Sequence, residues 1–437
     1  MFKTIKFSED AKAIIKLINT TKEHLFITGK AGTGKSTLLK HIYEQDPSII
    51  VLAPTGIAAI NVNGDTIHSF FKLKPRYELD EAKHVRINEK MMAKYIHIHT
   101  IIIDEISMVR ADILDAIDTF LQRVRKNNTS FGGIRMIFFG DLFQLPPVLQ
   151  NTERKKFLQQ YQTPYFFSAH VFEQKDLFIP PFTLKKCELK TIYRQKDLVF
   201  TNLLNAIRVD NIDSEQLNIL NKQVNNLIIQ QDEFLINLVA TNAIAININS
   251  DKLNRLSSKE ICFNASHKGN IENLKPNDTE VLIKEGAQVM FINNESKRRW
   301  VNGTIGKVVH IGTKIDKESG EQYQYVQVEL ENGEQVEVSP FTWEISKYIF
   351  KAGRFVREQI GTFTQIPLKL AWAITIHKSQ GKTFNRIHID LGNGSFAHGQ
   401  TYVALSRCTK LKGITLAKAI KQSDIIIDKS VIEFNTL

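Results

Sequence analysis

The sequence contains little cysteine and no long hydrophobic run. Its 437 residues include three cysteines, Cys187, Cys262 and Cys408, which are far apart and form no CxxC pair. This spacing excludes a disulfide framework and a thiolate zinc site, and it suits a reducing compartment. The longest apolar runs, such as Ile101–Ile103 and Met136–Phe139, fall far short of the roughly 18 residues that span a bilayer.

The chain opens without a basic head followed by an apolar stretch, because residues 1–10 are mixed and polar. We therefore expect neither a secreted nor a membrane-spanning protein. The expected location is the cytoplasm, in association with the nucleoid, in a bacterium, or the nucleus or mitochondrion in a eukaryote. The sequence also lacks an internal repeat and a low-complexity segment.

The charge balance is positive. The 57 Lys and Arg residues outnumber 46 Asp and Glu residues, which gives a net charge of +11. An acidic partner is expected, with nucleic acid first among candidates, although many proteins carry excess lysine without such a role. The length predicts two to four folded domains.

Short apolar runs alternate with helical patterns over the first 180 residues. Continuous apolar strands separated by helices indicate a parallel sheet covered on both faces. The strands are expected at Leu25–Thr28, Ile49–Ala53, Thr100–Ile103 and Met136–Gly140, and a helix at Ala111–Val124.

The pattern restarts after Pro180–Pro181, where we place a domain boundary. Strands at Leu235–Thr241 and Arg386–Asp390 indicate a second α/β domain. Three short β segments lie between them, and an Asn-Gly turn signal follows the second. They are expected at Thr304–Ile311, Tyr323–Glu331 and Glu334–Val338.

The stretch GKAGTGKST, Gly29–Thr37, matches the phosphate-binding pattern G-x-x-x-x-G-K-S/T between a strand and a helix. Backbone amides and the helix N-terminus would surround the phosphates of a nucleotide. Lys35 is expected to reach the β- and γ-phosphates, and Ser36 to bind Mg²⁺.

Two carboxylates end the apolar run IIIDE. Asp104 is expected to bind Mg²⁺, and Glu105 to polarise the attacking water. Taken alone, the pair would equally suit the start of a helix. Gln144 follows a third strand, where a residue that senses the γ-phosphate would lie.

The second half contributes TIHKSQGKT, residues 375–383, and YVALSRCT, residues 402–409. Arg407 and Arg194 are candidate arginine fingers for the γ-phosphate. Taken singly, such arginines are more often surface or salt-bridging residues.

The ordered set of motifs resembles the PIF-type DNA helicases of superfamily 1B, relatives of RecD. It includes FITGKAGTGKST, APTGIAAINVNGDTIHSFF, IIIDEISMV, FGGIRMIFFGDLFQLPPV, IYRQ, VNGTIGKVV and GQTYVALSR. The resemblance implies an α/β fold with two RecA-like domains that hold ATP and Mg²⁺, and 5′→3′ movement along single-stranded DNA.

The resemblance also assigns site residues. The expected catalytic set is Lys35, Asp104, Glu105, Gln144, Arg194 and Arg407, with Ser36 and Asp104 on the metal. Nucleotide contacts are expected from Gly29, Ala31, Gly32, Thr33, Gly34, Lys35, Ser36, Thr37 and Gly381. DNA contacts are expected from Thr55, Asn61, His68, Ser69, Phe70, His377, Lys378 and Ser379. Relatives carry an adenine-reading glutamine where this chain has Ala11, which leaves its preference for ATP open.

The implied domains follow the motifs. RecA-like domain 1 covers residues 1–71 and 95–181, with a wedge insertion at 72–94. RecA-like domain 2 covers residues 182–295 and 359–437, with an SH3-like β insertion at 296–358.

The expected partners are single-stranded, duplex and forked DNA, and the expected state in solution is a monomer. The resemblance suggests G-quadruplex and RNA–DNA hybrid substrates, with roles in replication, repair, recombination and telomere maintenance. Two alternatives stay open: a nucleotide-switched DNA-remodelling ATPase without processive unwinding, and an RNA helicase.

Overall fold

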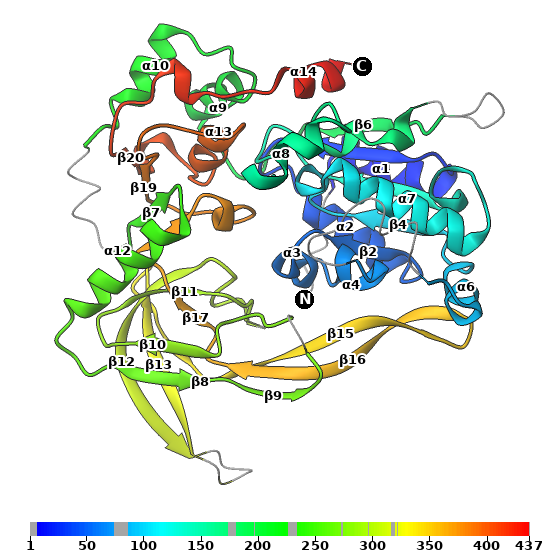
Figure 1. The fold of residues 1–437 in the computed structure, drawn as a ribbon. Helices are drawn as coiled ribbons and strands as arrows, with labels where there is room; N and C mark the ends of the chain where they lie inside the picture. Colours follow the sequence, from blue (N-terminus) through cyan, green and yellow to red (C-terminus); the bar gives the residue numbers. More distant parts are fainter. Residues whose placement is uncertain are drawn as a thin grey trace. The chain divides into compact units, whose positions relative to one another are not determined.

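The computed structural model describes residues 7–73, 86–173, 181–195, 197–225, 234–271, 274–295, 297–315, 320 and 322–436 (Figure 1). The chain divides into two compact units. Unit 1 comprises Met1–Arg194, Ser346–Glu358 and Asp428–Leu437, and unit 2 comprises Gln195–Ile345 and Gln359–Ile427.

Unit 1 contains a six-stranded parallel sheet of order β3-β2-β4-β5-β1-β6. The four expected strands are confirmed, and the other two, β3 and β6, extend the sheet at its edges. The strands are β1 (Leu25–Gly29), β2 (Ile50–Ala53), β3 (Asp65–Thr66), β4 (Thr100–Ile103), β5 (Arg135–Phe139) and β6 (Lys185–Leu189).

Alternate residues of these strands enter two different cores, because successive side chains point to opposite faces. Leu25 and Ile27 pack with α1 (Glu9–Thr20) and α2 (Lys35–Gln45) on one face. Phe26 packs with α7 (Ala111–Arg125) on the other face. Both faces are therefore covered by helices, as the continuous apolar runs predict.

Buried aspartates of α7 hold neighbouring loops in place. The Asp118 carboxylate accepts a hydrogen bond from the Phe131 amide (2.6 Å), and Asp115 accepts from the His170 and Val171 amides. Among the described residues of unit 1, the other α-helices are α3 (Gly56–Asn61), α4 (Ile67–Phe71), α6 (Glu89–Tyr95), α8 (Asn151–Leu158) and α14 (Lys429–Thr436).

Unit 2 contains a second parallel sheet, of order β18-β7-β19-β20. Its strands are β7 (Ile236–Val239), β18 (Ala373–Thr375), β19 (Ile387–Asp390) and β20 (Ile414–Leu416). The α-helices in the described part of unit 2 are α9 (Leu198–Arg208), α10 (Ser214–Asn221), α12 (Asn242–Asn254) and α13 (Gln400–Leu405). The predicted α/β class is thus confirmed.

The β-rich part of unit 2 is larger than the expected insertion at 296–358, because strands of its sheets begin at Ile261 and end at Leu370. The predicted β segments are present as β12, β13 and β14, and a register shift interrupts the β12–β13 pairing at Val308/His310. The strands are β8 (Ile261–Asn264), β9 (Ser266–Gly269), β10 (Glu280–Ile283), β11 (Gln288–Phe291), β12 (Ile305–Ile315), β13 (Gln322–Leu330), β14 (Gln335–Val338), β15 (Phe341–Lys351), β16 (Arg354–Gln365) and β17 (Leu368–Leu370).

The expected boundary at 181/182 is wrong, because β6 pairs with β1 inside the sheet of unit 1. Two later segments also belong to unit 1. The tip of the β15–β16 hairpin contributes Tyr348, whose hydroxyl accepts a hydrogen bond from the Val51 amide (3.1 Å). Helix α14 contributes Phe434, which stacks on Phe167.

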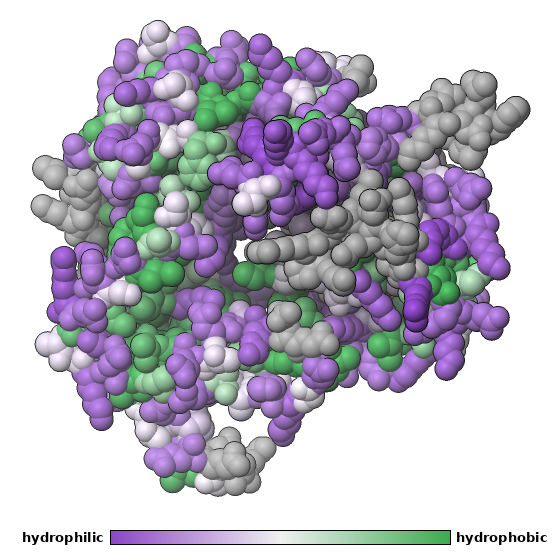
Figure 2. Space-filling model, viewed as in Figure 1, coloured by the Kyte–Doolittle hydropathy of each residue, from purple (hydrophilic) through white to green (hydrophobic). Residues whose placement is uncertain are grey.

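Most of the expected wedge insertion, residues 74–85, lies outside the described residues. Within the described ranges, the structure has no helix long and apolar enough to cross a membrane. The face drawn in Figure 2 is mostly hydrophilic, and hydrophobic patches lie among hydrophilic residues over the β-rich part of unit 2.

Candidate nucleotide and DNA sites

The phosphate-binding loop joins the end of β1 to the start of α2. The Lys35 ammonium folds back over this loop and donates to the carbonyls of Gly29 (2.5 Å) and Lys30 (3.2 Å). Thr33 also donates to the Lys30 carbonyl (2.9 Å), whereas Ser36 and Thr37 are exposed at the first turn of the helix. Ala31 is buried at 7% exposure. The loop therefore presents hydroxyls and the helix N-terminus, a suitable setting for phosphates.

Glycine is required in this loop. Gly32 has φ +84°, and a Cβ there would approach the Arg194 Cβ to 2.4 Å. Gly34, with φ +87°, lies against the Tyr193 ring. A side chain at either position would meet the strain of a left-handed backbone.

Asp104 and Glu105 follow β4 directly. Asp104 is 7% exposed, and its amide donates to the Leu52 carbonyl (2.8 Å). Burial and the neighbouring Glu105 carboxylate raise the pKa of Asp104, while the Lys35 charge opposes this rise. Glu105 has a left-handed backbone with φ 50°, which is unfavourable for this residue type and is frequent at functional sites.

Gln144 is buried on the segment after β5. Its Nε2 donates to the Asp141 carboxylate (3.2 Å), and Asp141 also accepts from the Phe143 amide. Asp141 therefore orients Gln144, a role that the sequence analysis missed. The signal was present, because Asp141 follows a buried strand just as Asp104 does.

Arg194 lies beside the phosphate-binding loop, as its contact with Gly32 shows. The preceding Tyr193 was also missed: its amide donates to the Gly32 carbonyl (2.9 Å), and its side chain is 52% exposed. Ala11 is buried in α1 within the core beneath the sheet. This position therefore offers no side chain for reading a base.

The DNA-contact candidates of unit 1 follow β2 and β3. Thr55 caps α3 by accepting from the Ala58 amide (3.3 Å), and Asn61 is exposed at the end of that helix. His68 and Ser69 lie half-buried in α4, and burial lowers the pKa of His68. For Phe70, the structure corrects the expected DNA contact. Its side chain is 5% exposed and packs on Phe71, Tyr95, Tyr348 and Phe355. The ring is therefore unavailable for base stacking.

The candidates of unit 2 lie on a single turn after β18. Lys378 is exposed, and His377 is half-buried, which lowers the pKa of its imidazole. Ser379 is fully buried and its hydroxyl donates to the Ile376 carbonyl (2.7 Å). Ser379 thus stabilises the turn that presents the other two side chains.

Arg407 is 1% exposed and lies in the interior of unit 2. Its guanidinium donates to the carbonyls of Val403 (2.9 Å), Ser379 (3.3 Å) and Lys382 (3.4 Å), and to the Ser406 hydroxyl (2.8 Å). Arg407 is therefore hydrogen-bonded to the turn at 377–382. Gly381, on this turn, has φ +76° and open space around it.

Comparison with known proteins identifies the family. The description "PIF1-like helicase" applies to the family model that matches residues 6–218. The chain is 32% identical over 440 residues to the ATP-dependent DNA helicase Pif1 of Bdellovibrio bacteriovorus, with 98% of this chain and 92% of that protein covered. The chain belongs to the PIF1-like helicase family.

Other PIF1-like helicases agree with this assignment. The chain is 28% identical to ATP-dependent DNA helicase PIF1 of Emericella nidulans and spans 62% of that longer protein. Unliganded Pif1 from Bacteroides sp. has a TM-score of 0.86 and 36% identity, with 99% of this chain and 97% of that chain covered. As a member of this family, the chain is an ATP-dependent DNA helicase.

Proposed function

We propose that this chain hydrolyses ATP at the edge of the unit 1 sheet to move 5′→3′ along single-stranded DNA and to open duplexes and forks. One observation carries the nucleotide part. Strands β4, β5 and β1 are neighbours in a parallel sheet, so their carboxyl ends share one edge. Asp104 and Glu105, then Gln144, then the phosphate-binding loop follow these three ends.

The residues at this edge suit phosphate hydrolysis. The loop amides and Lys35 would hold the phosphates, and Lys35 would exchange its bonds to the Gly29 and Lys30 carbonyls for phosphate oxygens. The exposed Ser36 hydroxyl and the Asp104 carboxylate are hard oxygen donors of the kind that Mg²⁺ prefers. When bound with ATP, Mg²⁺ would neutralise charge on the phosphates.

Glu105 is the proposed general base, accepting a proton from the attacking water. Gln144, oriented by Asp141, would position that water. Both roles need an ionised carboxylate, and Asp104 is the more buried of the two. A related protein, Pif1 from Bacteroides sp., has been crystallised with ADP-AlF4.

The proposed DNA binding by unit 1 is argued from the same edge of the sheet. Leu52 of β2 accepts from the Asp104 amide, and the chain reaches Thr55 three residues later. A displacement of the Asp104 backbone would therefore be transmitted to β2 through this one hydrogen bond, and from β2 to the proposed DNA contacts that follow it. These contacts are Thr55, Asn61, His68 and Ser69. Bacteroides Pif1 has been crystallised bound to single-stranded DNA. We propose that His377 and Lys378 grip the same strand from unit 2.

The experiment is an ATPase titration with single-stranded DNA. We expect stimulation by DNA, and a loss on the order of 10³-fold in the rate for Lys35→Ala because a phosphate ligand is removed. DNA affinity should be retained. Lys40→Ala, an exposed lysine of the same helix, is the matched control and should keep full activity. ATPase activity indifferent to DNA would contradict the proposal.

The direction of movement along DNA is tested with a pair of duplex substrates. Fluorescent duplexes with either a 5′ or a 3′ single-stranded tail should be opened only from the 5′ tail. Hydrolysis stimulated by DNA without opening of either duplex would instead favour a nucleotide-switched remodelling ATPase. Stronger stimulation by RNA than by DNA would favour an RNA helicase.

A further inference from the structure

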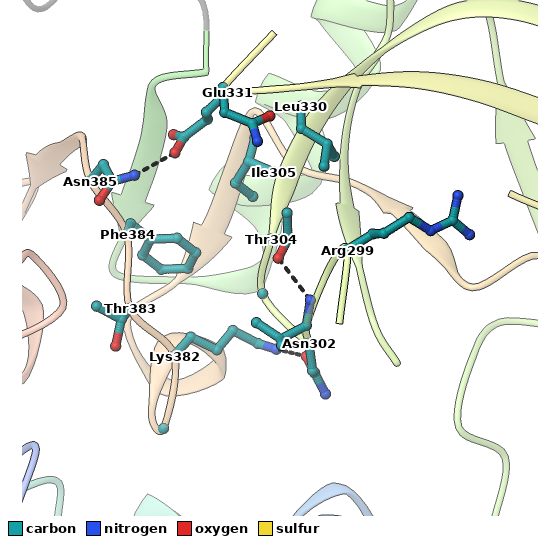
Figure 3. Close-up of a pocket in the computed structure, with 14 residues that line it drawn as sticks. Arg299, Asn302, Thr304, Ile305, Leu330, Glu331, Lys382, Thr383, Phe384 and Asn385 are labelled. Carbon is teal, nitrogen blue, oxygen red and sulfur yellow. Dashed lines mark hydrogen bonds between the residues drawn. The ribbon is translucent and has the colours of Figure 1, made fainter. Parts of the chain in front are cut away.

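Unit 2 has a pocket of about 570 Å³ whose walls include parts of the motifs VNGTIGKVV and TIHKSQGKT (Figure 3). The segment 299–305 forms one side, and residues 381–385 form another. A third side comes from Leu330, Glu331 and Asn332 at the end of β13. The volume falls within the range of roughly 300–1,000 Å³ that is usual for small-molecule sites.

Lys382 is the central cation of this pocket. Figure 3 shows its side chain extended along the pocket towards Asn302, to whose Oδ1 its ammonium donates a hydrogen bond. The alkyl chain lies near Gly303, where a Cβ would be 3.7 Å from the Lys382 Cβ. Among the described residues, its ammonium forms no ion pair with a carboxylate.

The surroundings of Lys382 disfavour its charged form. Burial, helped by the positive charge of Lys369, lowers the pKa of Lys382 to about 8. The other charged groups of the pocket are Arg299 and Glu331. Arg299 is paired with Glu295 (3.0 Å), and Glu331 accepts from the Asn385 amide. A half-buried cation without a carboxylate partner is stabilised most by an anionic ligand.

The position of the pocket suggests which anion. Lys382 lies three residues after Ser379, on the turn that carries His377 and Lys378. The carbonyls of Ser379 and Lys382 are both held by Arg407, so the DNA-contact turn and the pocket wall are one supported segment. A strand bound by His377 and Lys378 would therefore lie within a few residues of the pocket wall.

We propose that this pocket binds a backbone phosphate of the single-stranded DNA, with Lys382 and Asn302 as its ligands. The inference rests on the proposed function, because it extends the grip of His377 and Lys378 by one site. The side-chain amide of Asn302 adds an uncharged hydrogen-bond donor, and the open space around Gly381 leaves room for a nucleotide. Recognition of a phosphate would be independent of sequence.

The first test is Lys382→Met, which keeps the length of the side chain and removes its charge. Binding of a fluorescein-labelled oligothymidine should weaken roughly tenfold because a charge-assisted hydrogen bond is lost. The slope of log K against log salt should fall by about 0.7, as expected for one phosphate contact on a single strand. Lys252→Met, at an exposed position of α12, is the control and should change neither quantity.

The second test uses pH. A bound phosphate favours the charged amine, so affinity should be highest below the pKa of about 8 and should fall as pH rises through it. We expect a loss on the order of fivefold to tenfold between about pH 7.5 and 9. Lys382→Arg stays charged and should keep the affinity while losing this dependence. A variant damaged only in packing would not become insensitive to pH.

The outcomes separate this inference from the proposed function. Unchanged DNA affinity in Lys382→Met, with affinity lost in Lys378→Met, would overturn the pocket assignment and leave the DNA grip of unit 2 intact. Unchanged affinity in both variants would contradict that grip as well. Weakened binding of fluorescent ADP in Lys382→Met, with DNA affinity retained, would also overturn the assignment, because the phosphate would then belong to a free nucleotide.

Discussion

In each unit, one cationic side chain of the sequence motifs donates hydrogen bonds to backbone carbonyls of a loop. The two side chains differ greatly in how far they are buried. In unit 1, Lys35 donates to the carbonyls of Gly29 and Lys30 at the partly exposed start of α2. In unit 2, Arg407 donates to the carbonyls of Ser379 and Lys382 from a position that is 1% exposed. Both cations are candidates for contact with the phosphates of ATP.

The difference concerns what each cation must give up to reach a phosphate. Lys35 is partly exposed and has a flexible side chain, so it exchanges carbonyls for phosphate oxygens at little cost. The Arg407 guanidinium has at least four hydrogen-bond acceptors in the interior, and a carbonyl left without a donor there costs free energy. Phosphate binding by Arg407 would therefore rearrange the turn at 377–382, whereas Lys35 would change only its own loop.

The largest effect that tests this contrast is expected for Arg407→Ala. Because three carbonyls and one hydroxyl lose their donor, unit 2 should lose about 3 kcal/mol in the free energy of unfolding. The ATPase rate should fall by about 10³-fold if the arginine also serves the γ-phosphate. Urea unfolding followed by tryptophan fluorescence and a steady-state ATPase assay measure the two effects.

Lys35→Ala is the reference for that measurement. It should reduce ATPase activity without lowering stability, because Lys35 is only partly buried. Equal destabilisation by the two substitutions would contradict the contrast between the loops.

A smaller effect is expected for Gly32→Ala in the phosphate-binding loop. The new Cβ would lie 2.4 Å from the Arg194 Cβ, on a backbone with φ +84°. The loop must shift, and the affinity for fluorescent ADP should fall about tenfold, with the left-handed backbone itself costing roughly 1–2 kcal/mol. Gly56→Ala is the control, because a Cβ there has nothing within 4 Å. Unchanged affinity in Gly32→Ala would mean that the loop adapts freely.

The smallest effect is expected for Ser406→Ala. This substitution removes the hydroxyl that accepts from Arg407 and leaves its contacts with the carbonyls of Val403, Ser379 and Lys382 in place. The Ser406 hydroxyl also donates to the Val403 carbonyl (3.0 Å), so two hydrogen bonds are lost. Stability should fall by about 1–2 kcal/mol, and the ATPase rate by less than about threefold. A loss as large as that of Arg407→Ala would show that the hydroxyl, rather than the carbonyls, determines the position of the guanidinium.

The sheet of unit 1 and its loop were predictable because local signals carry them. Apolar runs specify β1, β2, β4 and β5, and glycines at positive φ specify the loop between β1 and α2. The short β6 was not found, because Lys185–Leu189 contains two lysines and a glutamate and lies at the sheet edge. An exposed edge strand lacks the apolar run on which the prediction depends.

The environment of single side chains was less predictable. The sequence offers Phe70 as an aromatic residue beside His68 and Ser69, but only the fold shows that distant residues Tyr348 and Phe355 cover it. The same holds for the basic stretch that contains Lys347 and Arg357. It forms the tip of the β15–β16 hairpin, where Arg357 donates to the Gly64 carbonyl (3.2 Å). Long-range contacts of this kind leave no periodic signal.

The packing of α14 has a consequence for the order in which the protein is made. Phe434 contacts Phe26, Phe166 and Phe167, so the core of unit 1 contains residues from both ends of the chain. Synthesis proceeds from the N-terminus, and domains usually fold as their last contacts become available. The first unit to leave the ribosome therefore completes its core last, after all of unit 2 has been translated.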